Sequence, residues 1–294
     1  MLLLVDYSSL LYRAFHSLPE SLPARGVYGI LGMLARLVQD RRPRGLGICV
    51  DDDWRPAFRV EALPSYKAHR VAEVEAEADP VAADEAIGRA VLQAIGVAVL
   101  GAEGYEAEDV IATLAAHTRA RVEVVSGDRD CFALVEDPHV SVLYPVRGVS
   151  ELAVIDEAAV TKRYGIPGRA YLDFALLRGD PSDGLPGVAG IGEKTAAQLV
   201  ARYGSLDAVL AALDAGDRAL SPAVAHKLAA GRDYLAAARR VVPPCGAVPL
   251  PAISLDLPTA TAHPRTLARL TAEHGLQTPV ERFARALGLA TASA

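Results

Sequence analysis

The chain has 294 residues, a formal net charge of −6, 51% hydrophobic residues and 22% charged residues. This length suits one large domain or a domain with an appendage, and the composition excludes a mostly disordered chain. No apolar run reaches the roughly 18–20 residues that cross a bilayer, and Met1 leads into an apolar strand without the basic segment of a signal peptide. Three scattered cysteines exclude a disulfide scaffold and a cysteine-based zinc site. We expect a soluble, cytoplasmic protein without a membrane anchor.

Apolar segments alternate with helical patterns through the first half of the chain. Short, apolar strands are expected at Leu2–Val5, Leu46–Val50, Val97–Leu100, Val122–Val125, Val140–Tyr144 and Leu152–Ile155. Between them, apolar residues recur at helical spacing, as in Val27–Val38 and Ile87–Ile95. This alternation predicts the α/β class, with a mainly parallel central sheet flanked by helices.

From Asp156 onward the pattern is largely helical. Helices are expected at Asp156–Tyr164, Arg169–Leu177, Thr195–Tyr203, Leu206–Leu213 and Pro222–Val241. A Pro- and Ala-rich extended connection then leads to a last helical piece within Pro264–Leu287. We therefore divide the chain into a core over 1–155, a helical region over 156–245, and a C-terminal extension over 246–294 that packs on the core.

Acidic residues follow several predicted strands. In an open parallel sheet the carboxyl ends of the strands share one rim, so acids placed there converge. Those at strand ends and at the start of the helix after the third strand are Asp6, Asp51, Asp52, Asp53, Glu106, Glu108, Asp109, Asp128 and Asp130. A single such acid is often a solvated cap, but like charges that converge repel unless metal ions neutralise them. An all-carboxylate site selects hard cations, namely Mg²⁺ or Mn²⁺.

A second acidic pair, Asp180 and Asp183, lies in a turn ahead of a glycine-rich block, Gly187–Ala196. The block is not a P-loop, because Glu193 stands where that motif needs lysine, and no strand precedes it as in a dinucleotide-binding fold. It fits a small-residue turn between two helices. Such a turn exposes backbone amides and Lys194 to a phosphate backbone without reading bases.

These motifs resemble those of the 5′-nuclease family, which comprises flap endonucleases and the 5′→3′ exonuclease domain of bacterial family A DNA polymerases. The matching stretches are Leu4–Ser9 with Tyr12–His16, Tyr66–Arg70, Gly104–Ile111, Ser126–Asp130 and Gly179–Ala196. Their order and spacing agree over about Leu2–Val242. The resemblance implies a helical arch over a cleft, at about residues 60–85, and a DNA-binding helix–two-turn–helix module.

The resemblance also implies residue roles. Its metal-site acids fall on Asp6, Asp52, Glu106, Glu108, Asp109, Asp128, Asp130, Asp180 and Asp183, which would hold two or three Mg²⁺ or Mn²⁺ ions. Asp52 is chosen by counting back from Phe58-Arg59, with Asp51 and Asp53 as weaker candidates. The basic cleft residues fall on Arg13, Lys67 and Arg70. The DNA-binding hairpin falls on Gly187, Gly190, Gly192, Lys194 and Thr195, with K⁺ as a further ion held by its turn.

Three departures from the family pattern stand out. Gly184 occupies a position where the family usually has Asn, and the arch segment Val71–Asp79 carries four acids and no base. The chain stops at Ala294 without polymerase or proofreading domains, so we expect a free-standing, monomeric enzyme. Without the nine acids of the proposed site, the net charge of −6 becomes +3, so the acidic balance does not exclude a DNA partner.

The sequence therefore predicts a metal-dependent, structure-specific 5′-nuclease that acts on DNA flaps, gaps and nicked 5′ ends in replication and repair. Two alternatives stay open. One is a phosphatase that uses Asp128 and Asp130 as a nucleophile pair, although Phe132 stands where that motif has Thr or Val. The other is a non-catalytic module that binds DNA junctions, for which nine converging acids would bring only repulsion.

Overall fold

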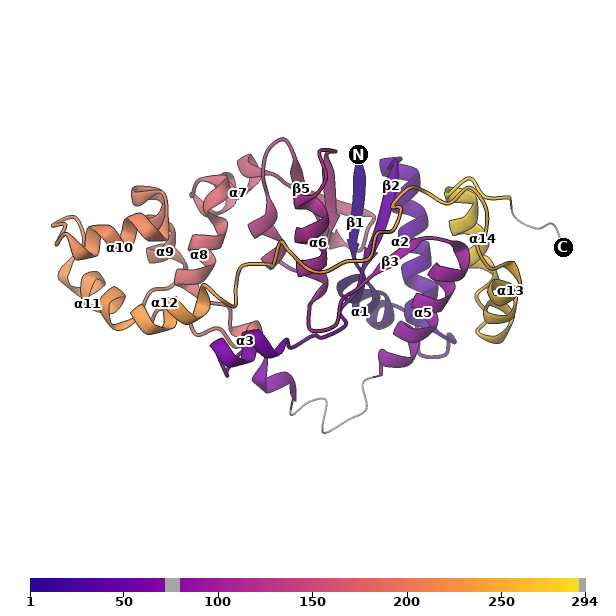
Figure 1. Ribbon diagram of the computed structural model, residues 1–294, viewed down its shortest axis with the longest axis horizontal. Coiled ribbons are helices and arrows are strands. Elements are labelled where there is room, and N and C mark those ends of the chain that lie inside the picture. The colour runs from indigo at the N-terminus through magenta and orange to yellow at the C-terminus, as the bar shows by residue number, and fades with distance from the viewer. Residues whose placement is uncertain (72–79, 291–294) are drawn as a thin grey trace.

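The computed structural model describes residues 1–71 and 80–290. Most of the arch segment Val71–Asp79 therefore lies outside the described residues. The described chain forms a six-stranded sheet in the order β3-β2-β1-β4-β5-β6 (Figure 1). Its strands are β1 (Leu2–Asp6), β2 (Gly45–Cys49), β3 (Ala98–Leu100), β4 (Val122–Val125), β5 (Val140–Arg147) and β6 (Glu151–Ile155). All neighbours pair parallel except β5 and β6, which confirms the mainly parallel sheet expected from the sequence.

Side chains of the central strand β1 alternate between two hydrophobic layers, as the period of a strand requires. Leu3 and Val5 pack into the layer formed with helices α1 (Tyr7–Ser17), α2 (Arg25–Arg41) and α5 (Ala82–Ile95). Leu2 and Leu4 pack into the other layer, which includes α6 (Ala107–Ala116). Because both faces are covered, β1 is apolar along its whole buried length until Asp6.

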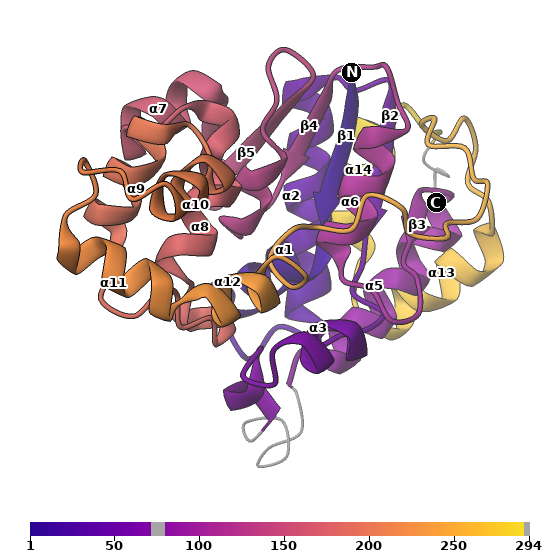
Figure 2. The ribbon, with the colours of Figure 1, turned by 60° about the vertical axis from the view of Figure 1, so that its left-hand side comes forward.

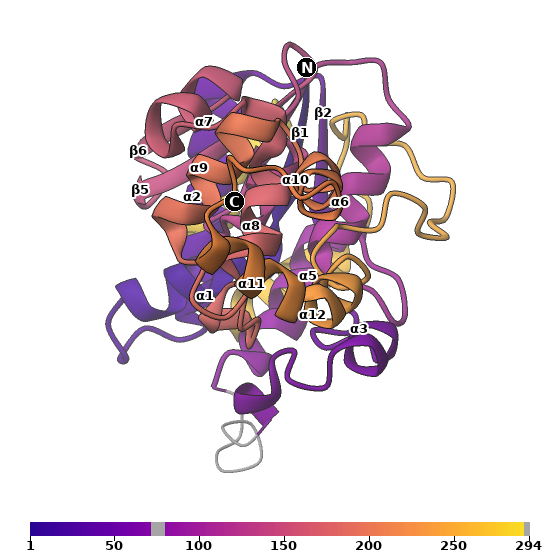
Figure 3. The same ribbon diagram turned by 90° about the vertical axis from the view of Figure 1, so that its left-hand side faces the viewer.

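A helical region lies beside the β6 edge of the sheet (Figures 1 and 3). Its helices are α7 (Glu157–Tyr164), α8 (Tyr171–Arg178), α9 (Glu193–Tyr203), α10 (Leu206–Asp214), α11 (Pro222–Ala230) and α12 (Arg232–Ala238). The single helix expected over Pro222–Val241 is wrong, since Gly231 separates α11 from α12. A Cβ at Gly231 would lie 2.8 Å from Val188, so this break lets the chain pack closely on the turn before α9.

An extended segment after α12 crosses the core and leads to the C-terminal helices (Figure 2). The Leu46 amide donates to the Leu255 carbonyl at 2.7 Å, and the His263 amide to the Ala94 carbonyl at 2.9 Å. The last helical piece is two helices, α13 (Pro264–Glu273) and α14 (Gln277–Ala286), separated at Gly275 with φ +66°. Their apolar faces join the layer of α2 and α5. Among the described helices, none is long and apolar enough to span a bilayer.

Candidate active site

The carboxyl ends of β1 and β4 meet at the rim where the acids were expected. Asp6 ends β1 and caps α1, accepting a hydrogen bond from the Ser9 amide at 3.1 Å. The buried Ser126, directly after β4, donates to Asp6 Oδ2 at 2.6 Å and accepts from the Asp128 amide at 2.9 Å. Ser126 thus fixes Asp6 and Asp128 relative to each other. Sequence reasoning missed this role, although the place of Ser126 at the strand end was visible.

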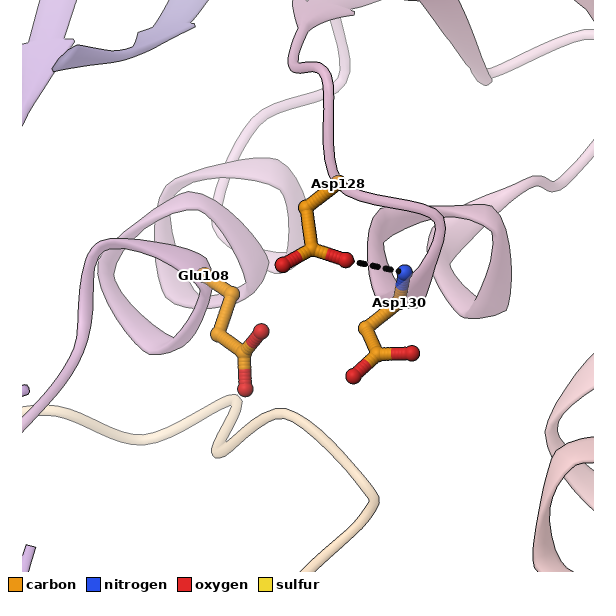
Figure 4. A group of neighbouring side chains, drawn as sticks. All are labelled: Glu108, Asp128 and Asp130. Atoms are coloured by element: carbon orange, nitrogen blue, oxygen red, sulfur yellow. Dashed lines mark hydrogen bonds between the residues drawn. The ribbon is translucent and has the colours of Figure 1, made fainter. Parts of the chain in front are cut away.

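Three carboxylates converge below this rim. Glu108 comes from α6, Asp128 from the loop after β4, and Asp130 from the first position of the 3-10 helix Asp130–Leu134. Figure 4 shows their carboxylates turned toward one another. One oxygen from each lies within 4.8 Å of the others. The Asp130 amide donates to Asp128 Oδ1 at 2.9 Å, which holds the two aspartates on one side of the group.

These acids carry negative charge that the described side chains do not neutralise fully. Burial and the nearby charge of Asp51 raise the pKa of Asp6 to about 7. Burial, with the charges of Glu106 and Asp130, raises the pKa of Glu108, although Arg59 opposes the rise. Burial and the charge of Asp128 likewise raise the pKa of Asp130. An oxygen-only donor set with surplus negative charge fits Mg²⁺ or Mn²⁺.

The three aspartates after β2 point in different directions. Asp51 accepts from the Ala107 amide at 2.7 Å and adds its charge to that of Asp6. Asp52 instead accepts from Arg89 Nη1 at 2.7 Å, on the side of α5. The structure therefore places Asp51 beside Asp6, in place of the Asp52 that counting along the sequence selects.

Two other predicted ligands surround a buried guanidinium. Arg59, from α3 (Ala57–Ala62), has an exposed fraction of 0% and makes two hydrogen bonds to Asp109, at 2.7 and 3.0 Å. Arg59 also donates to Glu106 and lies 3.0 Å from Glu108. Asp109 further accepts from the Cys245 amide at 2.7 Å. The Asp109 carboxylate thus links α6 to α3 and to the segment after α12 by hydrogen bonds.

The basic residues expected at the arch base lie against the acids. Lys67 pairs with Glu106 and lies 3.8 Å from Asp183, and it is nearly buried. Arg70 Nη2 donates to Asp183 Oδ1 at 2.7 Å, with 39% of its side chain exposed. Arg13 Nη2 donates to the carbonyl of Gly127, the residue before Asp128, at 3.3 Å. Arg70 therefore lies beside Asp183 and Arg13 beside the loop of Asp128, while Lys67 is more buried than Arg70.

The turn that carries Asp180 and Asp183 is fastened to the arch base. The Asp183 carbonyl accepts from the Lys67 amide at 2.9 Å, and Ser65 Oγ donates to the Gly184 carbonyl at 2.8 Å. Gly184 has φ +69°, and a Cβ there would lie 2.1 Å from the Ser65 carbonyl oxygen. Glycine at this position therefore allows the close contact with Ser65. Asp180 caps its own turn, accepting from the Ser182 amide at 2.9 Å.

Comparison with known proteins identifies the family. Family models for the "5'-3' exonuclease, N-terminal resolvase-like domain" and the "5'-3' exonuclease, C-terminal SAM fold" match residues 1–165 and 166–264. The chain belongs to the 5′-3′ exonuclease family. It is a phosphodiester hydrolase that acts on DNA, and the family and enzyme class expected from the sequence are confirmed.

Two 5′-3′ exonucleases match this one over nearly its whole length, and a DNA polymerase matches about three quarters of it. A 5′-3′ exonuclease of Streptomyces coelicolor is 45% identical over 96% of this chain and 98% of its own, and one of Mycobacterium tuberculosis is 42% identical over 97% of each. DNA polymerase I of Mycobacterium bovis is 46% identical over 73% of this chain, which corresponds to 24% of the polymerase.

Solved structures share the fold. T5 5′-exonuclease with bound zinc has a TM-score of 0.67 at 19% identity, with 97% of each chain covered. A T5 flap endonuclease variant in complex with DNA and metal ions has a TM-score of 0.64 at 20% identity, over 98% of this chain and 99% of that one.

The exonuclease presents its glycine-rich turn between α8 and α9. Gly187 and Gly190 adopt φ +70° and +75°, and Gly192 precedes the first residue of α9. Lys194 is exposed in the first turn of α9, beside Thr195. Lys227 of α11 donates to the Gly190 carbonyl at 3.0 Å. Sequence reasoning missed Lys227. The one feature of the sequence that could have drawn attention to it is the small number of lysines, four in the chain.

Proposed function

We propose that this exonuclease uses bound Mg²⁺ or Mn²⁺ to cleave DNA at 5′ flaps, gaps and nicked 5′ ends in replication and repair, leaving a 5′-phosphate and a 3′-hydroxyl. The observation that carries the proposal is the convergence of Glu108, Asp128 and Asp130, whose oxygens lie within 4.8 Å of one another. The T5 enzymes, which share the fold of this chain, were solved one with divalent metal ions and one with DNA and metal ions, and this supports the proposal.

The proposed ligand set follows the observed positions. Asp6 and Asp51 would hold an ion on one side, and Glu108, Asp128 and Asp130 would hold one on the other, with Asp180 and Asp183 completing the second site from the turn. Glu106 and Asp109 would orient their helix through Arg59. Two bound ions would supply an activated water and stabilise the charge on the leaving oxygen.

The cations of the chain would position the phosphate. Arg70 is partly exposed and its guanidinium is fixed by Asp183, so it can neutralise a phosphate entering over the acids. Arg13 would do the same from the other side, where the Gly127 carbonyl holds it. Lys67 is nearly buried between Glu106 and Asp183, and it would keep these acids in place while contacting the phosphate from below.

The hairpin would hold the duplex away from the cleavage point. Gly187, Gly190 and Gly192 leave three positions of the turn without a side chain, and Lys194 adds positive charge next to the first amides of α9. The Gly190 carbonyl already accepts from the ammonium of Lys227, so this oxygen does not call for K⁺. We retain K⁺ as a proposal for the other turn carbonyls.

A flap duplex labelled at the 5′ end, incubated with and without Mn²⁺, tests the function. We expect shortened, labelled oligonucleotides only with Mn²⁺, and no product from Asp128→Asn. Release of inorganic phosphate from the 5′ end would indicate the phosphatase alternative. Binding of the flap without cleavage in any divalent ion would indicate a junction-binding module.

A further inference from the structure

Arg89, in the second half of helix α5, forms hydrogen bonds with the loop that carries Asp51. Its guanidinium donates to the Asp51 carbonyl at 2.6 Å and to Asp52 Oδ1 at 2.7 Å. The same group donates twice to Glu85, one turn earlier on α5, at 2.5 and 3.0 Å. Glu85 therefore fixes the direction of the guanidinium, and the guanidinium fixes both the main chain of Asp51 and the side chain of Asp52.

The residue before Arg89 contacts the other half of the rim. Gly88 lies against Tyr7, the residue that follows Asp6, and a Cβ at Gly88 would lie 1.9 Å from Tyr7 Oη and 3.2 Å from Cζ. Tyr7 is fully buried, and within the described part of the chain its hydroxyl has no hydrogen-bond partner. The absence of a side chain at Gly88 therefore sets how closely α5 approaches the end of β1.

We propose that Gly88 and Arg89 together form a positioning device that sets the separation of Asp6 and Asp51. The charges of these two carboxylates repel. Against this repulsion, the Ala107 amide holds the Asp51 carboxylate and Arg89 holds the Asp51 carbonyl. Arg89 holds Asp51 through its carbonyl, while Gly88 admits Tyr7 and so places Asp6. Arg89 bonds the Asp51 carbonyl and Gly88 contacts Tyr7, so the device itself uses no carboxylate oxygen of Asp6 or Asp51.

This inference rests on the proposed function, in which Asp6 and Asp51 bind a divalent ion. It goes further because Gly88 and Arg89 lie outside every motif that carries the family resemblance. Partners that orient metal ligands typically change metal affinity by about 10–100-fold when removed. Arg89 touches neither substrate nor the reacting atoms in this arrangement, so its effect should fall on metal affinity and leave the chemical step intact.

Replacement of Arg89 tests the first half of the device. We expect Arg89→Met to raise the Mn²⁺ concentration for half-maximal flap cleavage by about tenfold, with the rate at saturating Mn²⁺ within about twofold of wild type. Arg89→Lys, which can reach one acceptor, should lie between. Calorimetric titration of the protein with Mn²⁺ alone should show the same order. Arg36→Met, which removes an exposed pair with Asp40, is the matched control.

A double substitution tests the second half without removing a charge. Gly88→Ala should push Tyr7 and raise the Mn²⁺ requirement, and adding Tyr7→Phe should lower it again, because the atom that a Cβ would strike is gone. Tyr7→Phe alone is the reference for this cycle.

The proposal would be overturned if Arg89→Met and Gly88→Ala lowered the melting temperature but left the Mn²⁺ requirement and calorimetric affinity unchanged, since their role would then be structural only. Wild-type cleavage that is independent of Mn²⁺ in the same titration would refute the proposed function instead.

Discussion

Three consecutive aspartates follow β2, and each has a different partner. Asp51 accepts from the Ala107 amide, Asp52 from Arg89, and Asp53 from the Arg55 amide. Of these three aspartates, Asp51 is the one whose charge raises the pKa of Asp6. The ligand to a divalent ion should therefore be Asp51.

Paired amide substitutions check this assignment. Asp51→Asn should lower flap cleavage by at least about 100-fold because it removes a proposed ligand. Asp52→Asn keeps an acceptor for Arg89 and should stay within about tenfold of wild type. Initial rates across a Mn²⁺ titration decide between them. If Asp52→Asn is the inactive variant and Asp51→Asn is active, counting from Phe58 was right and the observed orientations mislead.

The same residues show where sequence reasoning stops. Side chains on extended backbone alternate in direction, so an error of one position exchanges Asp51 for Asp52. Counting back from Phe58 assumes a fixed length for the loop before α3. Asp109 was included because it lies at the start of the helix after the third strand, but the sequence gives no sign that Arg59, 50 residues away, pairs with both Asp109 and Glu106. Ion pairs between residues far apart in the sequence depend on how the helices pack, which the sequence pattern does not show.

At the level of elements, the strands were predictable and the helix breaks were not. The apolar runs place each observed strand within a few residues, and most clearly β1, which is buried on both faces and apolar up to Asp6. Gly231 and Gly275 each divide a helical segment that the sequence predicts as one piece. These breaks were missed because a single glycine inside a helical pattern does not by itself indicate a helix end. Division of the chain at 155/156 stays a prediction, and the two family models meet at 165/166.

Arg59 joins α3, α6 and the segment that leaves α12, because it also donates to the Val241 carbonyl at 2.9 Å. Arg59→Met should lower the free energy of unfolding by about 3–5 kcal/mol, since it leaves Asp109 buried without its cation and Glu106 with Lys67 alone. Adding Asp109→Asn should restore part of the loss. Urea unfolding measures both, and Arg36→Met, an exposed pair, should change little. A loss below about 1 kcal/mol for Arg59→Met would show that water or Lys67 compensates.

The hairpin contacts belong to two helices. Lys194→Ala on α9 and Lys227→Ala on α11 should each weaken duplex binding equally for unrelated sequences and reduce the salt slope by about one. Fluorescence anisotropy over a range of salt concentrations measures this. Arg269→Ala, on α13 at the opposite end of the molecule, is the control (Figure 1). Unchanged binding by Lys227→Ala would assign Lys227 to holding the turn alone.

The acidic centre lowers the stability of the whole molecule when no metal ion is bound. Asp6 has a pKa of about 7 in the folded chain, against an ordinary value of 3.8, because of burial and the charge of Asp51, while the hydrogen bond from Ser126 partly opposes the rise. Between these two values the folded state holds a proton that the unfolded state has lost. Stability of the metal-free enzyme should therefore fall as pH rises from about 4 to 7, and change little from this group above that range.

Thermal unfolding in a chelator, at pH 5.5 and 7.5, measures the effect. Asp6→Asn keeps the cap of α1 but cannot ionise, so the melting temperature of wild type relative to this variant should fall between pH 5.5 and 7.5, by about 2–4 °C for each kcal/mol. Added Mg²⁺ should raise the wild-type melting temperature more at pH 7.5, because protons compete with the metal ion at pH 5.5. A wild-type melting temperature that stays constant relative to Asp6→Asn over this interval would mean that Asp6 is already ionised at pH 5.5 in the folded chain. The repulsion between Asp6 and Asp51 would then be relieved by the protein itself, and the need for a bound ion at this pair would disappear.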